Sequence, residues 1–419
     1  MKLSNYNYQL KINDENDLLY NTLSRKYIVF NKEDKEKLSQ IFDKLNEVNK
    51  DNINIMKELI KNGMLIDDDF DELEFLKFNE RRDIFQDEKF ELTINPTLNC
   101  NFRCIYCFEE HKKEFMSDEV ESAILKYVSN VATKVKYLKV VWFGGEPLLE
   151  FDRISSLSFK IKNICDEKHC EFSASMVTNG YLLDGIKANK LKELNIKHIQ
   201  VTLDGDKEYH DKQRPLANGE GTFDKIMENL INILNKGILV TLRINISESN
   251  VNYIQEIFNM IPKEKRGMVN VSIKNIFQNE NKISTYNIYR NAIEKGYYYR
   301  ELESRGPICS QNMKNSLTIE PDGRVTSCEI AGTEGVYIGK LDGEGKVIIK
   351  NSILYKLKNT SAYDSEKCVS CIKLPICKGG CMYSRYKDKD YCVGLGADGL
   401  TLDEKIKLQY YNDLMAEGY

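Results

Sequence analysis

Three cysteines in one short stretch constrain this chain more than any other feature. Cys100, Cys104 and Cys107 lie four and then three residues apart. A cubane iron–sulfur cluster normally takes four thiolates, so three cysteines in a loop would hold three irons and leave the fourth iron open. Two other interpretations compete: the spacing also lies on one face of a helix, as in a buried stripe, and clustered cysteines also bind zinc.

The flanking residues favour a cluster loop over both alternatives. The run from Phe90 to Ile94 alternates apolar and polar residues like a strand, and Pro96 interrupts regular structure. Asn99 and Asn101 suit a loop better than the inside of a helix. Three cysteines are also one ligand short of a closed structural zinc site. We therefore predict an iron–sulfur cluster with one open iron.

This stretch resembles the motif of the radical S-adenosylmethionine (SAM) enzymes, in which an aromatic residue precedes the third cysteine. Tyr106 occupies that position here. The resemblance implies that Cys100, Cys104 and Cys107 bind a [4Fe–4S] cluster and that Tyr106 contacts SAM. In the family, the amino and carboxylate groups of SAM chelate the open iron, and reductive cleavage yields a 5′-deoxyadenosyl radical.

Six strand-like segments alternate with helix-like segments between residue 90 and about residue 300. The predicted strands lie near 90–95, 138–143, 172–178, 197–203, 238–246 and 269–275. Such alternation implies parallel βα units with right-handed crossovers and an active site at the carboxyl ends of the strands. The fold class is therefore α/β. The resemblance implies a partial (β/α)6 TIM-like radical SAM barrel, which we assign to residues 85–303.

Polar and glycine residues follow several of these strands. Gly144, Gly145 and Glu146 come after the second strand and match the family's GGEP motif, which holds the amino group of SAM. A Gly-Gly pair by itself is more often a plain turn.

The third and fourth strands end in residues that resemble SAM-contact positions of the family, Asn179 and Thr202. On the fifth strand, Arg243 stands among apolar neighbours, which indicates a carboxylate partner, and the carboxylate of SAM is a candidate. Each has a plainer interpretation. Polar strand ends followed by glycine also form routine turns, and Arg243 could pair with a structural carboxylate.

Seven more cysteines lie between residues 309 and 392: Cys309, Cys328, Cys368, Cys371, Cys377, Cys381 and Cys392. Two zinc knuckles would need two groups of four, which seven cysteines do not supply. The spacing matches the SPASM extension, which carries auxiliary [4Fe–4S] clusters, and we assign this domain to residues 304–395.

The resemblance divides these cysteines into two ligand sets. The distal set is Cys368, Cys371, Cys377 and Cys392, and the proximal set is Cys309, Cys328 and Cys381. In relatives with a closed proximal cluster, a further cysteine lies just upstream of the position of Cys309, but residues 301–308 contain none here. The resemblance therefore implies an open iron in the proximal cluster, which would bind a substrate thiolate and lower its pKa. The two cysteines outside all three sets, Cys165 and Cys170, are predicted to be free thiols.

Glu329 directly follows Cys328. In the sulfatase-maturing relatives an Asp at the matching place is the base that deprotonates the substrate, so Glu329 is a candidate catalytic base. A solvated loop carboxylate is the alternative.

The first 84 residues predict a small winged-helix-like unit. Strand-like segments at 6–12 and 26–30 precede two helical patterns and a short closing strand at 64–66. The unit is weakly similar to the PqqD-like recognition elements (RREs) that capture a leader peptide as an added strand. A plain structural cap on the barrel is the alternative. A helix is predicted near 403–415, within a C-terminal segment at 396–419.

Charge and hydropathy exclude other classes of protein. The 60 basic and 64 acidic residues give a net charge of −4, so nucleic acid is not an expected partner. No apolar run approaches eighteen residues and the N-terminus lacks a signal-peptide core, so we expect no membrane association and a cytoplasmic location. Twelve cysteines in a reducing compartment suit metal ligands better than disulfides.

The resemblance implies an oxidoreductase that matures ribosomally synthesised and post-translationally modified peptides (RiPPs). The expected reaction is a Cys thioether crosslink in a Cys-containing precursor peptide, as in sactipeptides and ranthipeptides, with a flavodoxin or ferredoxin as electron donor. The alternatives are another SPASM reaction, namely formylglycine formation or a carbon–carbon or carbon–oxygen crosslink, and a zinc-stabilised binding protein without enzyme activity.

Overall fold

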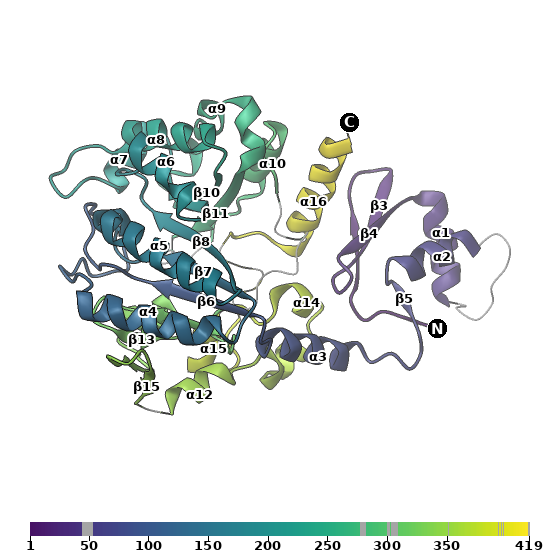
Figure 1. Cartoon of the computed structure of the whole chain (residues 1–419). Coiled ribbons are helices and arrows are strands. Elements are labelled where there is room, and N and C mark those ends of the chain that lie inside the picture. The colour runs from purple at the N-terminus through teal and green to yellow at the C-terminus, as the bar shows by residue number, and fades with distance from the viewer. Residues whose placement is uncertain are drawn as a thin grey trace.

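The computed structural model describes residues 1–43, 53–276, 282–299, 302, 309–350, 352–392, 394, 396 and 398–417. A large α/β body carries a smaller N-terminal unit at its side, and helix α3 (Glu72–Ile84) leads from one to the other (Figure 1). Asp71 caps α3 by accepting hydrogen bonds from the backbone N–H groups of Leu73 and Glu74. The predicted boundary between barrel and auxiliary-cluster domain, at residues 303 and 304, lies outside the described residues.

The centre of the large body is a parallel sheet. Its six strands are β6 (Lys89–Ile94), β7 (Tyr137–Trp142), β8 (Glu171–Thr178), β9 (Ile196–Thr202), β10 (Leu239–Ile246) and β11 (Val269–Asn275). They pair side by side in chain order and all run parallel. The predicted strands and the α/β class are confirmed. Because parallel strands in this order have their carboxyl ends at one edge, the loops that follow them meet there.

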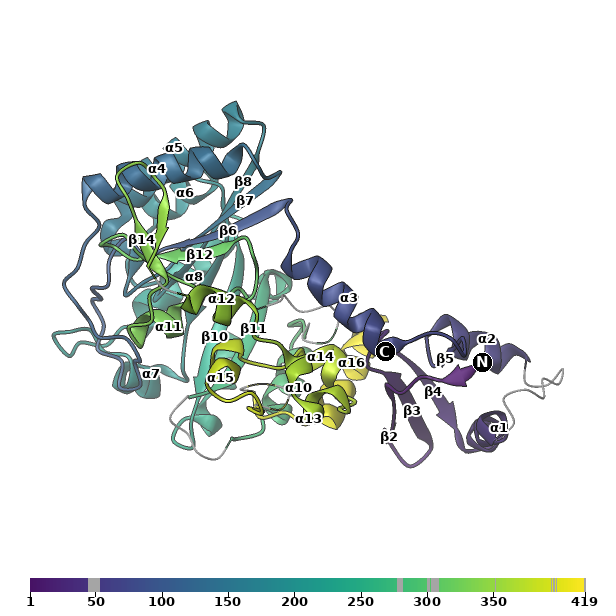
Figure 2. The same cartoon turned by 90° about the horizontal axis from the view of Figure 1, so that it is seen from below.

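Helices follow most of the strands and cover the sheet. They are α4 (Asp118–Ala132), α5 (Phe151–Glu167), α6 (Gly185–Glu193), α7 (Lys207–Gln213), α8 (Phe223–Asn235), α9 (Ile257–Met260) and α10 (Tyr286–Glu294). Helix α8 shows why they pack: its apolar residues recur every three or four positions, and that stripe is buried. Figure 2 shows α4 and α5 at one side of the sheet, and the later helices α10, α14 (Leu374–Cys377) and α16 (Leu402–Glu417) lie away from them.

The segment after residue 309 extends the same sheet. Strand β12 (Ser316–Ile319) pairs in parallel with β6, and β13 (Arg324–Thr326), β14 (Gly339–Leu341) and β15 (Val347–Ile349) continue antiparallel. Five short helices complete the segment: α11 (Glu329–Thr333), α12 (Ile353–Lys358), α13 (Glu366–Val369), α14 (Leu374–Cys377) and α15 (Met382–Lys387). The pairing of β12 with β6 places the first part of the cysteine-rich segment beside the strand that leads to Cys100.

The N-terminal unit contains a three-stranded antiparallel sheet, β2 (Asn7–Lys11), β3 (Asn16–Asn21) and β4 (Lys26–Asn31). Helices α1 (Lys32–Asp43) and α2 (Ile53–Lys61) follow, and β5 (Leu65–Ile66) pairs with β1 (Lys2–Leu3). The sequence predicted β2, β4, the helices and β5 but missed β1 and β3. The burial of three successive residues, Leu18, Leu19 and Tyr20, hides the alternation that marks a strand.

The last helix, α16 (Leu402–Glu417), joins the two parts of the molecule (Figure 1). Its Leu402 and Ile406 share a buried apolar cluster with Leu18 and Tyr20 of β3. The Tyr27 hydroxyl of β4 donates a 2.7 Å hydrogen bond to the Asp413 carboxylate. The helix therefore contacts the N-terminal sheet as well as α10, and the helix predicted near 403–415 is confirmed.

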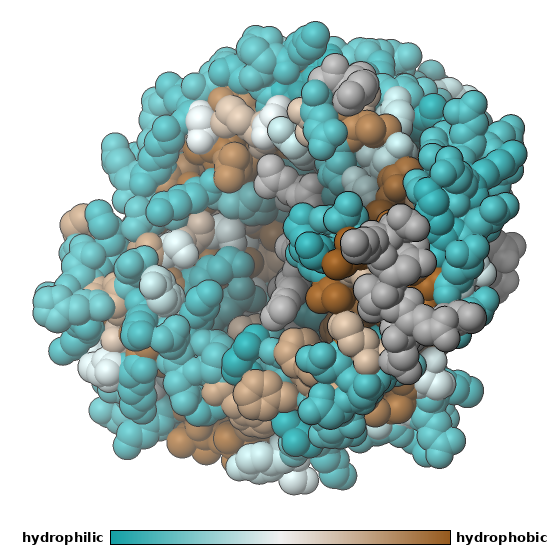
Figure 3. Space-filling model, turned by 90° about the vertical axis from the view of Figure 1, so that its right-hand side faces the viewer, coloured by the Kyte–Doolittle hydropathy of each residue, from teal (hydrophilic) through white to brown (hydrophobic). Residues whose placement is uncertain are grey.

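The surface is mainly polar. The face drawn in Figure 3 is mostly hydrophilic, with small hydrophobic patches between the charged groups. Among the helices in the described part of the chain, none is both long and apolar enough to cross a lipid bilayer.

Candidate active site

The three-cysteine stretch is a loop that follows β6, so the helical-stripe alternative is wrong. Phe102 is fully buried and bridges to Leu216, and the Arg103 N–H donates a 2.9 Å hydrogen bond to the Pro215 carbonyl. The Ile105 N–H bonds the Gln213 carbonyl in the same way at 3.0 Å. The loop is therefore fastened along its length to the segment that follows α7.

The three thiols of the loop are close enough to influence one another. Burial raises the pKa of Cys100 to about 12, and Glu146, Cys104 and Cys107 add to that rise. Thiols with raised pKa values bind as thiolates only when a strong positive charge replaces their protons, as iron does. In the described residues no three His, Cys, Asp or Glu side chains surround a point closely enough to hold a single metal ion. Three neighbouring thiols of this kind are a donor set that an iron–sulfur cluster would fit.

The Gly144–Gly145 turn touches the backbone that leads into this loop. A Cβ atom on Gly144 would lie 2.4 Å from the Thr97 carbonyl oxygen, and one on Gly145 would lie 2.3 Å from the Asn99 carbonyl oxygen. Both distances are far shorter than a van der Waals contact, and Gly144 also has a φ of +109°. Glycine is needed here because two backbone segments of the protein meet, whatever ligand the turn also holds.

Glu146 lies at the centre of this junction and is completely buried. Its carboxylate accepts hydrogen bonds from the Thr178 hydroxyl at 2.7 Å, the Asn179 N–H at 2.8 Å and the Leu148 N–H at 3.0 Å. Burial raises its pKa, and these donors oppose the rise. Glu146 thus ties the end of β8 to the turn after β7.

Asn179 connects this junction to the cysteine loop. Its side-chain amide donates a 2.8 Å hydrogen bond to the Asn101 side-chain carbonyl and lies 3.9 Å from the Cys100 sulfur. The structure therefore brings together the predicted residues Gly144, Gly145, Glu146 and Asn179 around Cys100.

Tyr106 belongs to a second buried network, at the ends of β9 and β10. Its hydroxyl hydrogen-bonds the Asp204 carboxylate and accepts from Arg214 Nη1 at 2.7 Å and from the Asn245 side-chain amide at 3.1 Å. Burial raises the pKa of Asp204, whereas the Arg214 charge lowers it. Burial also raises the pKa of Cys104, again opposed by Arg214. The positive charge of Arg214 therefore acts on both the Asp204 carboxylate and Cys104 of the cysteine loop.

Asp204, Arg214 and Asn245 were not among the predicted site residues. For Asp204 the available signal was an Asp-Gly pair at a strand end, which routine turns share.

Thr202 and Arg243 are register partners on neighbouring strands beside this network. The Arg243 Nε donates a 2.9 Å hydrogen bond to the Asn245 side-chain carbonyl. Burial lowers the pKa of Arg243, and the negative charge of Asp204 opposes this effect. A structural carboxylate therefore already faces Arg243, which was the plainer of the two interpretations. Thr202 is nearly buried at 8% exposure.

Glu329 begins helix α11 and accepts a 3.1 Å hydrogen bond from the Thr318 hydroxyl. It faces two acidic side chains that the sequence did not single out, Glu109 and Glu320. Burial raises the pKa of Glu109 to about 7, and the charges of Glu320 and Glu329 add to that rise. Glu109 lies two residues after Cys107 and Glu329 directly after Cys328. The charge of Glu329, beside Cys328, therefore acts on Glu109, which is near Cys107.

The C-terminal cysteines fall into two electrostatic groups. Burial raises the pKa of Cys328 to about 12, with contributions from Cys309 and Cys381. Burial likewise raises the pKa of Cys377, with contributions from Cys392, Cys368 and Cys371. These groups coincide with the predicted proximal and distal sets. Cys165 and Cys170 are buried together in the barrel core, as expected for thiols outside both sets.

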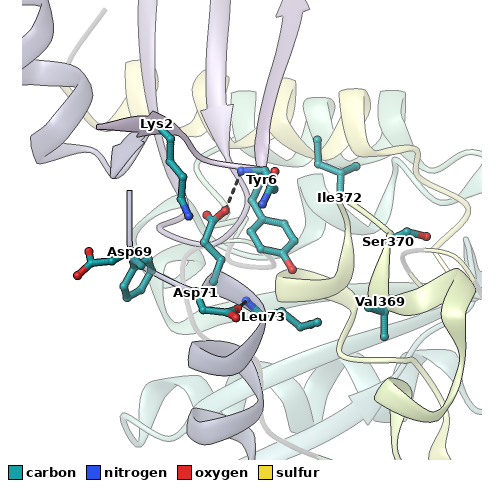
Figure 4. A pocket seen from close by; sticks show the side chains of 11 residues that line it. Lys2, Tyr6, Asp69, Asp71, Leu73, Val369, Ser370 and Ile372 are labelled. Atoms are coloured by element: carbon teal, nitrogen blue, oxygen red, sulfur yellow. Dashed lines mark hydrogen bonds between the residues drawn. The ribbon is translucent and has the colours of Figure 1, made fainter. Parts of the chain in front are cut away.

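A pocket of about 670 Å³ lies between the N-terminal unit and the distal cysteine segment (Figure 4). Lys2 lies in β1, Tyr6 in the turn before β2 and Asp71 before α3, and Ser370 and Ile372 flank Cys371. No predicted SAM-contact residue lines this pocket. The Thr22 hydroxyl also donates a 2.6 Å hydrogen bond to the Ile372 carbonyl. The N-terminal unit is therefore seated directly on the distal cysteine segment.

Residues 94–261 match the family model of the Radical SAM superfamily. The chain therefore carries a radical SAM domain, and the cysteine loop and the strand-end junctions described above lie within it. The resemblance first indicated by the three cysteines is confirmed.

Three curated relatives match between 43% and 85% of the chain, and one of them is named as a radical SAM enzyme. The chain is 24% identical over 405 residues to the radical SAM cyclopropyl synthase TigE of Paramaledivibacter caminithermalis, covering 85% of this chain and 84% of TigE. It is 26% identical over 342 residues to a cysteine-type anaerobic sulfatase-maturating enzyme of Clostridium perfringens, covering 71% and 90%. Fe-coproporphyrin III synthase of Methanosarcina barkeri is 31% identical over 184 residues, but the match covers only 43% of either chain.

Solved structures share the fold at low identity. An anaerobic sulfatase-maturating enzyme, anSMEcpe, with bound AdoMet and a Cys peptide superposes with a TM-score of 0.58 at 19% identity, covering 78% of this chain and 97% of that one. Streptococcus suis SuiB bound to its precursor peptide SuiA superposes with a TM-score of 0.52 at 14% identity, covering 93% and 97%. These likenesses establish the fold, an α/β radical SAM fold with a mostly parallel central sheet.

Proposed function

We propose that this protein is a radical SAM peptide maturase that installs a thioether crosslink between a cysteine sulfur and a carbon of a ribosomally synthesised precursor peptide. Its relatives support a peptide or protein substrate, since they include sulfatase-maturating enzymes, and SuiB binds a precursor peptide. One observation favours the thioether in particular. The proximal set has three cysteines, one thiol fewer than a closed cluster needs, and Glu329, which directly follows Cys328, interacts electrostatically with Glu109, two residues after Cys107.

Cys100, Cys104 and Cys107 would hold the catalytic [4Fe–4S] cluster, and the proximal and distal sets would hold two auxiliary [4Fe–4S] clusters. When bound, these groups and SAM supply a 5′-deoxyadenosyl radical for hydrogen abstraction and an acceptor for the surplus electron. The Gly144–Glu146 turn, Asn179, Thr202, Arg243 and Tyr106 form the SAM side of the site in this proposal. Their mutual hydrogen bonds hold that side rigid before SAM arrives.

Glu329 is the proposed base for the substrate thiol. The hydrogen bond from the Thr318 hydroxyl positions one oxygen of the Glu329 carboxylate. In this proposal the other oxygen accepts the proton of the substrate thiol. The overall change removes two hydrogens from the peptide: one leaves as part of 5′-deoxyadenosine, and the thiol proton leaves to Glu329. The sulfur–carbon bond forms in their place.

The N-terminal unit is the proposed leader-peptide recognition element. Strands β2 and β4 form the two edges of its sheet, and a leader could add to such an edge as a further strand. Because Thr22 and Arg25 hydrogen-bond the carbonyls of Ile372 and Pro375, the unit is already docked on the auxiliary-cluster segment. A flavodoxin or ferredoxin in a reducing cytoplasm would supply the low-potential electron.

Oxidation of a single Cys to formylglycine is the second candidate reaction, because a relative that matches 71% of this chain is a cysteine-type anaerobic sulfatase-maturating enzyme. A carbon–carbon or carbon–oxygen crosslink is the third possibility for the same fold.

Mass spectrometry of a Cys-containing precursor peptide separates these reactions. The peptide is incubated anaerobically with reconstituted protein, SAM and reductant, and then alkylated. A thioether predicts a loss of two hydrogens with one thiol blocked to alkylation, together with 5′-deoxyadenosine. The same mass loss with every thiol still alkylated would refute the thioether and favour a carbon–carbon or carbon–oxygen crosslink, and replacement of the thiol by an aldehyde would indicate formylglycine.

A further inference from the structure

A buried arginine that the sequence did not single out lies among the distal cysteines. Arg385, in helix α15, is only 3% exposed. Its Nη2 atom donates a hydrogen bond to the Cys368 sulfur at 3.2 Å. A guanidinium hydrogen bond to a cysteine sulfur is the kind of contact that adjusts an iron–sulfur cluster.

The Arg385 guanidinium also donates hydrogen bonds to three backbone carbonyls. Nη2 donates to the Gly379 carbonyl at 3.0 Å and to the Tyr391 carbonyl at 2.8 Å, Nε also donates to Gly379 at 3.2 Å, and Nη1 bonds the Lys389 carbonyl. Gly379 lies between Cys377 and Cys381, and Tyr391 directly precedes Cys392. One side chain therefore connects the separate segments that carry Cys368, Cys377 and Cys392.

The charge of Arg385 has no carboxylate partner in the described part of the chain: every hydrogen bond recorded there goes to a carbonyl or to sulfur. Asp390 is near enough to feel the charge, but its carboxylate is held by the Ser365 hydroxyl at 2.7 Å. Buried charges in proteins are normally paired. A set of cysteine thiolates around iron would supply the missing negative charge.

The turn between Cys377 and Cys381 is shaped to the guanidinium. Gly379 has a φ of +87°, and a Cβ atom there would lie 2.6 Å from the Ala362 Cβ and 3.2 Å from Arg385 Nε. The turn therefore approaches the guanidinium as closely as only glycine allows. This close contact fixes the direction of the Gly379 carbonyl that Arg385 binds.

We propose that Arg385 is a positioning residue of the distal auxiliary cluster: it holds the segments of Cys368, Cys377 and Cys392 in the cluster-binding arrangement and raises the reduction potential of that cluster. The proposal rests on the auxiliary clusters of the proposed function. Positive charge and N–H donors near cluster sulfur stabilise the more negative, reduced state.

The test compares the full-length variants R385Q and R385K with wild type and with R82Q. Arg82 is a matched control, since its side chain is 53% exposed and pairs with Asp83 on helix α3. Each protein is reconstituted anaerobically, and iron per chain, iron release to a chelator, the reduction potentials followed by EPR, and substrate-free 5′-deoxyadenosine formation are measured. The last readout reports the radical SAM site independently of the distal one.

We expect R385Q to release its distal iron at least about tenfold faster than wild type, as the loss of a charge-assisted hydrogen bond implies, or to lack about four irons per chain. R385K should retain the cluster with a lowered distal potential, because lysine keeps the charge but not the fork of donors. R82Q should match wild type, and 5′-deoxyadenosine formation should stay within about twofold in all variants.

If R385Q released iron at the wild-type rate and had wild-type reduction potentials, the proposal would be wrong. Equal loss of iron at every site, together with loss of 5′-deoxyadenosine, would also overturn it, since Arg385 would then serve folding in general. Wild-type protein that holds only about four irons would refute the auxiliary clusters themselves, which is a failure of the proposed function and not of Arg385 alone.

Discussion

Replacing Gly145 by alanine should damage the site at the point where the turn after β7 meets the cysteine loop. The new Cβ atom would lie 2.3 Å from the Asn99 carbonyl oxygen and 2.7 Å from that of Leu98, so one backbone segment must move by about 1 Å to reach an ordinary contact. Asn99 directly precedes Cys100, so the displacement reaches the first cluster ligand.

The cost follows from the contacts that such a shift would break. The Gly145 N–H donates to the Thr97 carbonyl at 3.2 Å, and the Glu146 N–H donates to the Asn99 carbonyl at 2.9 Å. Weakening both bonds costs about 1–3 kcal/mol, and overpacking costs about 1–3 kcal/mol more. A total near 3 kcal/mol corresponds to a decrease in Tm of roughly 6–12 °C for a domain of about 200 residues.

Thermal unfolding of G145A and of the control variant G185A provides the assay, with iron content measured in parallel. Gly185 lies at the start of α6 with nothing within 4 Å of its would-be Cβ, so alanine there should be neutral or stabilise by about 0.5 kcal/mol. G145A should unfold earlier and bind less iron at the radical SAM site. If G145A matched G185A in both Tm and iron content, the close approach of the two backbones would be wrong.

Three further substitutions test other parts of the account. C381A should remove the proximal cluster and lower the iron content by about four per chain. The control C170A, which changes a buried thiol outside the cysteine sets, should keep the full iron content, and equal iron in the two variants would refute the proximal set. E146Q should lower stability by about 2 kcal/mol and weaken SAM binding about tenfold in calorimetry, because a side-chain NH₂ would face N–H donors; unchanged binding would contradict the role of this junction. Y27F should lower Tm by about 1–3 °C through loss of the hydrogen bond to α16, and an unaltered Tm would show that this contact does not join the two parts of the molecule.

The parallel sheet could be predicted from the sequence because its signals are local. Each strand from β6 to β11 shows apolar residues at alternate or successive positions over a short stretch, and most are separated from the next strand by a helical pattern. Strand β12 gives no such signal: it has four residues, and its partner β6 lies more than 200 residues earlier. The extension of the sheet into the cysteine-rich segment was therefore not predictable, and the same holds for β3, which is buried on both faces.

The residues of the candidate site differ in the same way: some can be recognised from local sequence and others cannot. The cysteines and the Gly144–Glu146 turn stand out by spacing, which a sequence displays directly. Asp204, Glu109 and Arg385 do not, because each depends on burial and on partners from distant segments. Arg385 in particular looks like one more basic residue among lysines until its donors are found on Gly379 and Cys368.

The most direct test of the central claim is the formation of 5′-deoxyadenosine by the reconstituted protein. Wild-type protein loaded with iron and sulfide is incubated anaerobically with SAM and dithionite, beside C104A, which lacks one ligand of the radical SAM cluster. We expect 5′-deoxyadenosine from wild type and none above background from C104A. Iron-replete wild-type protein that leaves SAM intact, or equal product from C104A, would contradict the assignment of Cys100, Cys104 and Cys107 as the catalytic cluster site.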